Sequence, residues 1–320
     1  MISVSGDGAH CAEVSEPRPR AIDQASRRRI YVLLIAVIVL WGANWPIMKM
    51  GLGYVPPLAF GALRLAIGSA CLFVLLAGTG RLRRPSLGDT RIVLSEAVLH
   101  MAAPLALMNI ALLHVEAGRS SVLSYTTPIW TVPLSLLLLG DRLTSFQGLG
   151  VAIGVAGILV LFGPSALAWY DADVVIGNAL LLLSALTWAA AILIARTQTW
   201  RLSPLQLAPW QMLLAALLLA IPALVYEPIA AIRWSPQLVA VLAFNGPIAS
   251  AFCFWGALVV SKELPPVMSS VGFLGAPVAG VLFSSLSLGE PMTCALIGGL
   301  VLIVLGIGLV SFGAREPSAH

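Results

Sequence analysis

Ten apolar runs, each about 20 residues long, follow one another along this chain. A transmembrane helix needs about 20 mainly apolar residues. Only 10% of the residues are charged and 59% are hydrophobic, whereas soluble domains are about 25% charged. The runs therefore predict an all-α membrane protein with about ten transmembrane helices and no sizeable soluble domain. The expected spans are 30–49, 57–78, 91–114, 118–139, 144–162, 174–195, 204–225, 237–260, 265–287 and 292–312.

The polar ends of the chain predict two cytoplasmic tails. Residues 1–29 finish in three arginines directly before the first apolar run, and no small-residue cleavage pattern follows that run. Because the run is long enough to span, we expect an uncleaved first helix after a disordered tail, not a secretory signal peptide. Residues 313–320 form the second expected tail.

The basic residues predict the orientation. With the N-terminus in the cytoplasm, only Lys49, Arg119 and Arg233 fall outside, which is the asymmetry of inner-membrane proteins. The C-terminus is then also cytoplasmic, and the Gly163–Asp173 loop, which has acids but no Lys or Arg, lies outside. The basic residues placed inside are Arg18, Arg20, Arg27, Arg28, Arg29, Arg81, Arg83, Arg84, Arg91, Arg142, Arg196, Arg201, Lys262 and Arg315.

The chain also contains an internal repeat. The segment 118–162 aligns with 267–311 without a gap, and the match extends to the first helix of each half. We expect a first repeat at 30–162 and a second at 174–312, each with five helices. An odd number of spans inverts the second repeat, which is the plan of secondary transporters that work by alternating access. Matched pairs include Trp41 with Trp188, Ser120 with Ser269, Pro128 with Pro277, Gly140 with Gly289, and Asp141 with Glu290.

Short motifs in the first two helices, and a pair of related motifs in the two halves, carry a family resemblance. They are Trp41-Gly42-Ala43-Asn44 with Lys49, Phe60 and Arg64-x-Ala66, Gly140-Asp141-Arg142-Leu143-Thr144, and Gly289-Glu290-Pro291-Met292-Thr293. With them the chain resembles EamA-type members of the drug/metabolite transporter superfamily over residues 30–312. The resemblance implies a ten-helix transporter, typically an exporter of amino acids or related metabolites. It also implies that helices one to four of each half line a central cavity, with the fifth outside.

Arg64 and Asn44 are the leading candidates for binding substrate. Arg64 lies eight residues into its helix, about 12 Å deep. A buried arginine is costly in a membrane, so it should face a cavity, a carbonyl or an acid. Asn44 reaches a similar depth, and together they suit a carboxylate. The alternative is that Arg64 only pins helix ends or extends to the interface.

The second half does not duplicate this pair. Gln211 stands opposite Arg64, and Ala191 stands opposite Asn44. The half-sites are therefore chemically unequal. We include Gln211 among the substrate-binding candidates.

Glu96 and His100 are the candidates for a proton relay. They are four residues apart on one helix and so share a face. Histidine titrates near neutral pH in general, which suits proton coupling. The alternative is that Glu96 pairs with Arg91 and His100 only forms a local hydrogen bond.

Aromatic and proline residues complete the predicted site. Trp41 and Trp188 are repeat partners near the middle of the bilayer, where interfacial anchoring does not explain them, and Tyr125 is a further candidate for the cavity wall. Pro128 and Pro277 occupy matching positions and are candidate hinges, or candidates for freeing backbone carbonyls. Bending for helix packing is the alternative.

These features predict a secondary transporter in the inner membrane that exports small polar metabolites, amino acids or related compounds foremost. Drug, sugar or nucleotide-type cargo on the same fold, and an integral membrane enzyme, are the alternatives. The four cysteines lack metal-ligand spacing and no P-loop is present, so we expect no metal, no cofactor, no catalytic residues and no ATP hydrolysis. Expected partners are the substrate and membrane lipid, not nucleic acid; a homodimer is left open.

Overall fold

The computed structural model describes residues 24–141, 143–161, 172–264 and 266–313. In these ranges the chain forms helices joined by short turns, without a β-strand. The expected all-α membrane fold is confirmed. The predicted tails, the loop between the repeats, Arg142 and Arg315 lie wholly or mostly outside the described residues.

The first five spans contain several helical segments. Their bounds are α1 Gln24–Leu52; α2 Pro57–Gly78; the 3₁₀ turn η1 Leu87–Asp89, α3 Thr90–Ser95, the π-helix η2 Glu96–Ala102 and α4 Ala103–Ala111; α5 Ala117–Ser124 and α6 Thr127–Leu139; and α7 Ser145–Leu161.

The last five spans follow the same order. Their bounds are α8 Ala172–Thr197; α9 Pro204–Tyr226, followed by the 3₁₀ turn η3 Ile229–Ala231; α10 Pro236–Ala243, the π-helix η4 Phe244–Phe252 and α11 Cys253–Glu263; α12 Pro266–Phe273 and α13 Gly275–Leu288; and α14 Cys294–Gly313.

Among the described residues, nine helical stretches are long and apolar enough to cross a membrane, and α7 is a shorter apolar helix of 17 residues. At 1.5 Å per residue α7 is about 26 Å long, slightly less than the hydrocarbon core of about 30 Å. The ten apolar runs of the sequence therefore all correspond to apolar helices in the structure.

The fourth and ninth spans, which contain the candidate hinges Pro128 and Pro277, are each broken along their length. α5 ends at Ser124 and α6 begins at Thr127, while α12 and α13 are separated at Leu274. Proline explains the first break, because Pro128 has no N–H to donate to the carbonyl of Ser124. The hydroxyl of Thr127 donates to that carbonyl instead, at 3.3 Å. Pro277 lies in the first turn after the second break.

Other irregularities also recur in both halves. The third span of each half contains a π-helical segment, η2 in the first and η4 in the second. Gly140 and Gly289, which follow α6 and α13, have φ angles of 69° and 68° and end their helices in the left-handed conformation. Glycine adopts this conformation without the steric cost that a Cβ imposes. The sequence repeat is therefore also a repeat of backbone irregularities.

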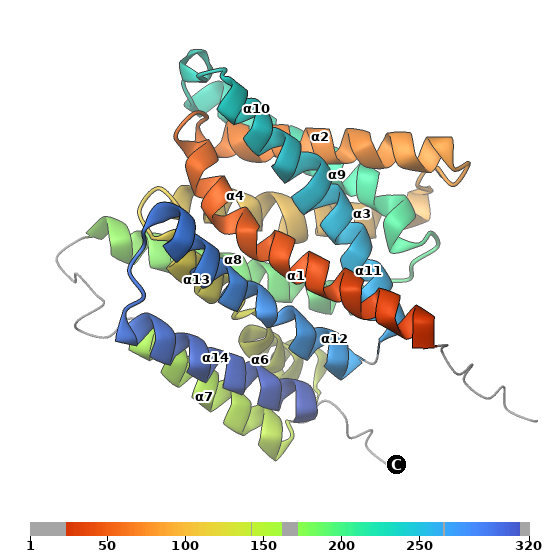
Figure 1. Ribbon diagram of the computed structural model, residues 1–320. Coiled ribbons are helices and arrows are strands. Elements are labelled where there is room, and N and C mark those ends of the chain that lie inside the picture. Colours follow the sequence, from red (N-terminus) through yellow and green to blue (C-terminus); the bar gives the residue numbers. More distant parts are fainter. Residues whose placement is uncertain (1–23, 142, 162–171, 265, 314–320) are drawn as a thin grey trace, which may run out of the picture.

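The fifth span of each half packs against its counterpart, away from the centre. α7 and α14 lie side by side at one edge of the bundle, opposite α2 and α9 (Figure 1). Glycines allow their backbones to approach closely: a Cβ on Gly306 would lie 2.6 Å from the carbonyl oxygen of Gly150 and 2.7 Å from the nitrogen of Gly154. Small residues are the usual means of such close packing in membranes.

This contact predicts a stability effect. Gly306→Ala should destabilise the protein by about 1–3 kcal/mol, because the added methyl group meets backbone atoms that cannot rotate away. Gly308→Ala on the same helix is the control, since nothing lies within 4 Å of the added Cβ. Thermal unfolding in detergent should show a lower midpoint for the first variant alone. Equal midpoints would contradict the assigned packing.

Candidate functional site

A cavity of about 160 Å³ lies among the helices of both halves. Helices one to four of the first half and the first three of the second half contribute to its wall, while none of the described residues of the ninth span does. The implied lining by four helices of each half is therefore met only in part. The wall consists of Trp41, Asn44, Trp45, Met48, Arg64, Leu65, His100, Met101, Pro104, Leu105, Met108, Ser124, Tyr125, Trp188, Met212, Ala249, Ser250 and Phe254.

Arg64 places a positive charge in this wall. It is the eighth residue of α2 and is only 7% exposed, which argues against its extending to the interface. Its Nε donates to the Ser250 hydroxyl at 3.2 Å, and its Nη1 lies 3.2 Å from the Met48 sulfur. None of the ion pairs formed among the described residues includes Arg64. A buried guanidinium with only neutral partners is suited to bind an anion that enters the cavity.

Neighbouring polar groups also have unused hydrogen-bonding capacity. The Asn44 amide donates to the Met48 sulfur at 2.8 Å, so this thioether contacts both Asn44 and Arg64. The Asn44 carbonyl oxygen and the Ser124 hydroxyl are buried without a partner. Buried polar atoms are nearly always paired in proteins. These two atoms belong to residues of the cavity wall and have unused hydrogen-bonding capacity.

The rest of the wall is mainly aromatic and sulfur-containing. The Trp41 indole N–H donates to the carbonyl of Ala249 at 3.2 Å, which holds its ring between the two halves. The Trp188 ring lies 5.2 Å from the His100 ring, centroid to centroid. Methionine side chains adapt to irregular shapes, which suits a wall that must accept an apolar group. The lining methionines are Met48, Met101, Met108 and Met212.

Glu96 and His100 form a close pair at the edge of this cavity. The His100 Nδ1 lies 2.5 Å from a Glu96 carboxylate oxygen, and both residues belong to the π-helical segment η2. Glu96 is buried, whereas His100 is half-buried and lines the cavity. In the described structure Glu96 pairs with His100 and not with Arg91, the alternative left open by the sequence. π-Helical segments are frequent at functional sites.

The structure gathers most of the predicted site residues around one cavity. Five of the six substrate candidates line it, and so does His100. Gln211 is buried but is not among the lining residues, although it is the repeat partner of Arg64. The lining substrate candidates are Trp41, Asn44, Arg64, Tyr125 and Trp188.

The candidate hinges lie beside the breaks in their spans and outside the cavity wall. Pro128 is in the first turn of α6, and Pro277 is in the first turn of α13.

Two residues that no sequence motif indicated, Met48 and Ser250, hold Arg64 in place. Met48 lies one turn after Asn44, and Ser250 is on η4 in the other half. The i,i+4 spacing was available for Met48, but no sequence spacing connects Ser250 with Arg64. Within the described part of the chain, no group of three or more His, Cys, Asp or Glu residues is arranged to hold a metal ion.

Comparison with known proteins agrees with this architecture. A solved protein crystal structure superposes with a TM-score of 0.61 at 23% identity and covers 90% of this chain and 98% of that one, which supports the fold alone. An uncharacterized transporter of Bacillus subtilis, YvbV, is 30% identical over 299 residues, which are 92% of this chain and 96% of the relative. A probable amino-acid metabolite efflux pump of Escherichia coli is 26% identical over 304 residues, or 91% and 98% of the two chains.

The family comparison covers both halves of the chain. The model of the EamA-like transporter family matches twice, at residues 28–163 and at residues 175–312. These matches include every residue that lines the cavity. The chain is thus a multi-pass membrane transporter, not an enzyme, and belongs to the EamA-like transporter family.

Proposed function

We propose that this transporter exports small carboxylate-bearing metabolites, amino acids foremost, by alternating access. The observation that carries the proposal is the buried Arg64 guanidinium in the cavity wall, whose partners are the Ser250 hydroxyl and the Met48 sulfur. A substrate carboxylate is the counter-ion that this charge lacks among the described residues. The 26% identical efflux pump named for amino-acid metabolites agrees with this cargo.

The cavity also favours a carboxylate over the other cargo of the fold. A cationic drug would be repelled by Arg64 and would need an acid facing it. Glu96 is the acid nearest to this role, but it is buried, hydrogen-bonded to His100 and absent from the cavity wall, so it does not face a cationic drug. Sugars would need several polar partners, whereas this wall is mainly aromatic, aliphatic and sulfur-containing.

The proposal includes a direction, a location and an energy source. The excess of basic residues on the side where α1 begins supports an inner-membrane protein with both termini in the cytoplasm. Glu96 and His100 are proposed as the proton relay, because their hydrogen bond joins a buried acid to an imidazole at the cavity wall. Protons entering the cell through this pair would drive the substrate out.

Counterflow in proteoliposomes tests the cargo. Vesicles are preloaded with one unlabelled amino acid at high concentration, and entry of a trace of the same labelled compound is followed. We expect saturable, transient accumulation for at least one amino acid and none for its carboxamide. If folded protein shows counterflow of sugars, nucleotides or cationic drugs but of no amino acid, the proposed amino-acid cargo is wrong.

A further inference from the structure

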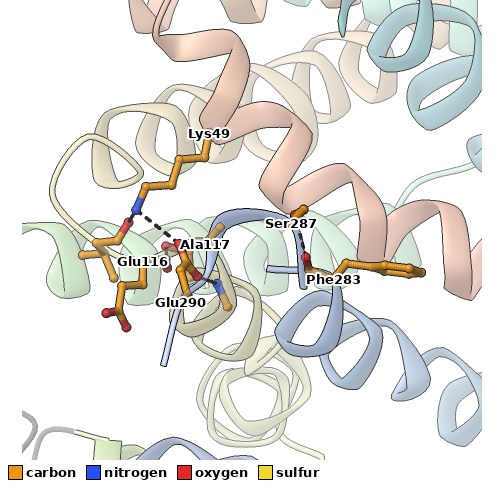
Figure 2. A network of polar contacts seen from close by, with 9 residues as sticks. Lys49, Glu116, Ala117, Phe283, Ser287 and Glu290 are labelled. Atoms are coloured by element: carbon orange, nitrogen blue, oxygen red, sulfur yellow. Dashed lines mark hydrogen bonds and ion pairs between the residues drawn. The ribbon is translucent and has the colours of Figure 1, made fainter. Parts of the chain in front are cut away.

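A second polar cluster lies outside the cavity, where α1 ends. The Lys49 ammonium is 3.4 Å from a Glu290 carboxylate oxygen and donates to the carbonyl of Val115 at 2.8 Å. The same carboxylate accepts the backbone N–H groups of Ala117 and Gly118, at 2.7 and 2.8 Å. Figure 2 shows Lys49 extending from α1 toward Glu290. One carboxylate of the second half thereby joins α1 and the first turn of α5.

The repeat places a chemically similar pair at the opposite face of the bundle. Arg196 follows Trp188 by eight residues, as Lys49 follows Trp41. Asp141 follows the left-handed Gly140, as Glu290 follows the left-handed Gly289. Arg196 and Asp141 also form an ion pair, at 3.6 Å. Both pairs join one half of the chain to the other.

The two pairs differ in how firmly they are held. The Lys49 and Glu290 side chains are 33% and 11% exposed, whereas those of Arg196 and Asp141 are 57% and 45% exposed. Glu290 also accepts two backbone N–H groups, whereas the hydrogen bonds and ion pairs of the Asp141 carboxylate among the described residues comprise the ion pair with Arg196 alone. Exposed ion pairs are weak, and charge-assisted bonds shielded from water are strong.

We infer that these pairs are two alternating gates, and that this structure is latched at the Lys49 face. When the Lys49–Glu290 latch opens, the repeat symmetry lets the exposed Arg196–Asp141 pair, already formed at 3.6 Å, become shielded from water and hold the opposite face in the same manner. The inference rests on the proposed alternating access and does not depend on the identity of the cargo.

The helix α5 connects the latch to the cavity. Its first two residues, Ala117 and Gly118, are held by Glu290, and its last residue, Ser124, lines the cavity together with Tyr125. Its eight residues span about 12 Å. Because the span is broken after Ser124, α5 can tilt without α6. Cargo that contacts Ser124 or Tyr125 therefore acts directly on the helix that the latch holds.

Cysteine accessibility tests the gates. The reporter is Ser124→Cys in a background whose four cysteines are replaced and whose folding has been verified. A membrane-impermeant thiol reagent is added to each face, and Trp234→Cys, which is exposed beside the Arg233 contact to Tyr54, identifies the Lys49 face. Glu290→Gln should raise labelling from the Lys49 face about fivefold or more and lower it from the other, because the latch loses its charge. Asp141→Asn should shift labelling the opposite way.

Glu227→Gln is the matched control. Glu227 accepts the N–H groups of Leu58 and Ala59 at 2.7 and 2.8 Å, the same geometry at the start of α2, but forms none of the ion pairs among the described residues. The Glu227→Gln variant should lower thermal stability without changing the labelling of the Ser124→Cys reporter. The proposed gates are refuted if Glu290→Gln lowers thermal stability without changing labelling. They are also refuted if Glu290→Gln and Asp141→Asn shift labelling in the same direction. Labelling needs no substrate, so a failure to find amino-acid transport does not affect this result.

Discussion

Arg64→Gln is expected to abolish transport of carboxylate-bearing substrates while the protein still folds. Glutamine keeps hydrogen-bonding capacity toward Ser250 but loses the charge that would hold the carboxylate. Removing one member of a buried charge pair costs about 2–5 kcal/mol, so the substrate concentration for half-maximal counterflow should rise about 30-fold or more. Thermal stability should stay the same or increase, because an uncompensated buried charge is removed.

Two comparisons separate substrate binding from a structural role. Arg64→Lys retains the charge but not the planar, forked donors, and should recover part of the transport. Arg91→Gln changes an exposed side chain of α3 that does not line the cavity, and it should leave counterflow unaffected. Unchanged counterflow in Arg64→Gln would remove this residue from the site. A large loss of stability with loss of transport would make it a structural pin.

The second large effect concerns proton coupling. A gradient of one pH unit is worth about 1.4 kcal/mol per proton, or about tenfold in substrate accumulation when one proton exchanges for one net-neutral amino acid and the membrane potential is held at zero. Glu96→Gln and His100→Gln should each eliminate that accumulation, because each removes one end of the hydrogen bond through which the proton would move. Counterflow without a pH gradient should persist, since exchange of like for like needs no net proton movement.

The measurement compares substrate accumulation with and without an imposed pH gradient in the same vesicles. Glu263→Gln is the control, because Glu263 is an exposed acid at the end of α11. Gradient-driven accumulation at the wild-type level in both relay variants would exclude this pair from coupling. Loss of counterflow as well would assign the pair to substrate binding or folding.

Most of the fold followed from local properties of the chain. Each span must be long enough and apolar enough to cross the bilayer by itself. For this reason the apolar run at 57–78 predicted the bounds of α2 residue for residue. The cost of burying charge in lipid likewise made Arg64 a candidate for facing a cavity, with a structural pin or an interfacial position as the alternative. The repeat identified Trp41 with Trp188, and both line the cavity. These inferences needed no knowledge of how the helices pack.

Tertiary structure alone decided which deep polar groups meet. Gln211 is the repeat partner of Arg64 but lies outside the cavity wall, because the rotation of each helix is set by its neighbours and not by its sequence position. Ser250 reaches Arg64 from the other half, and Glu290 holds the start of α5 across a separation of more than 170 residues. Side-chain contacts between distant spans depend on packing, whereas a span's tendency to enter the membrane depends on its own residues. The sequence by itself therefore determined the ten helices and their repeat, and packing determined the cavity wall and the latch.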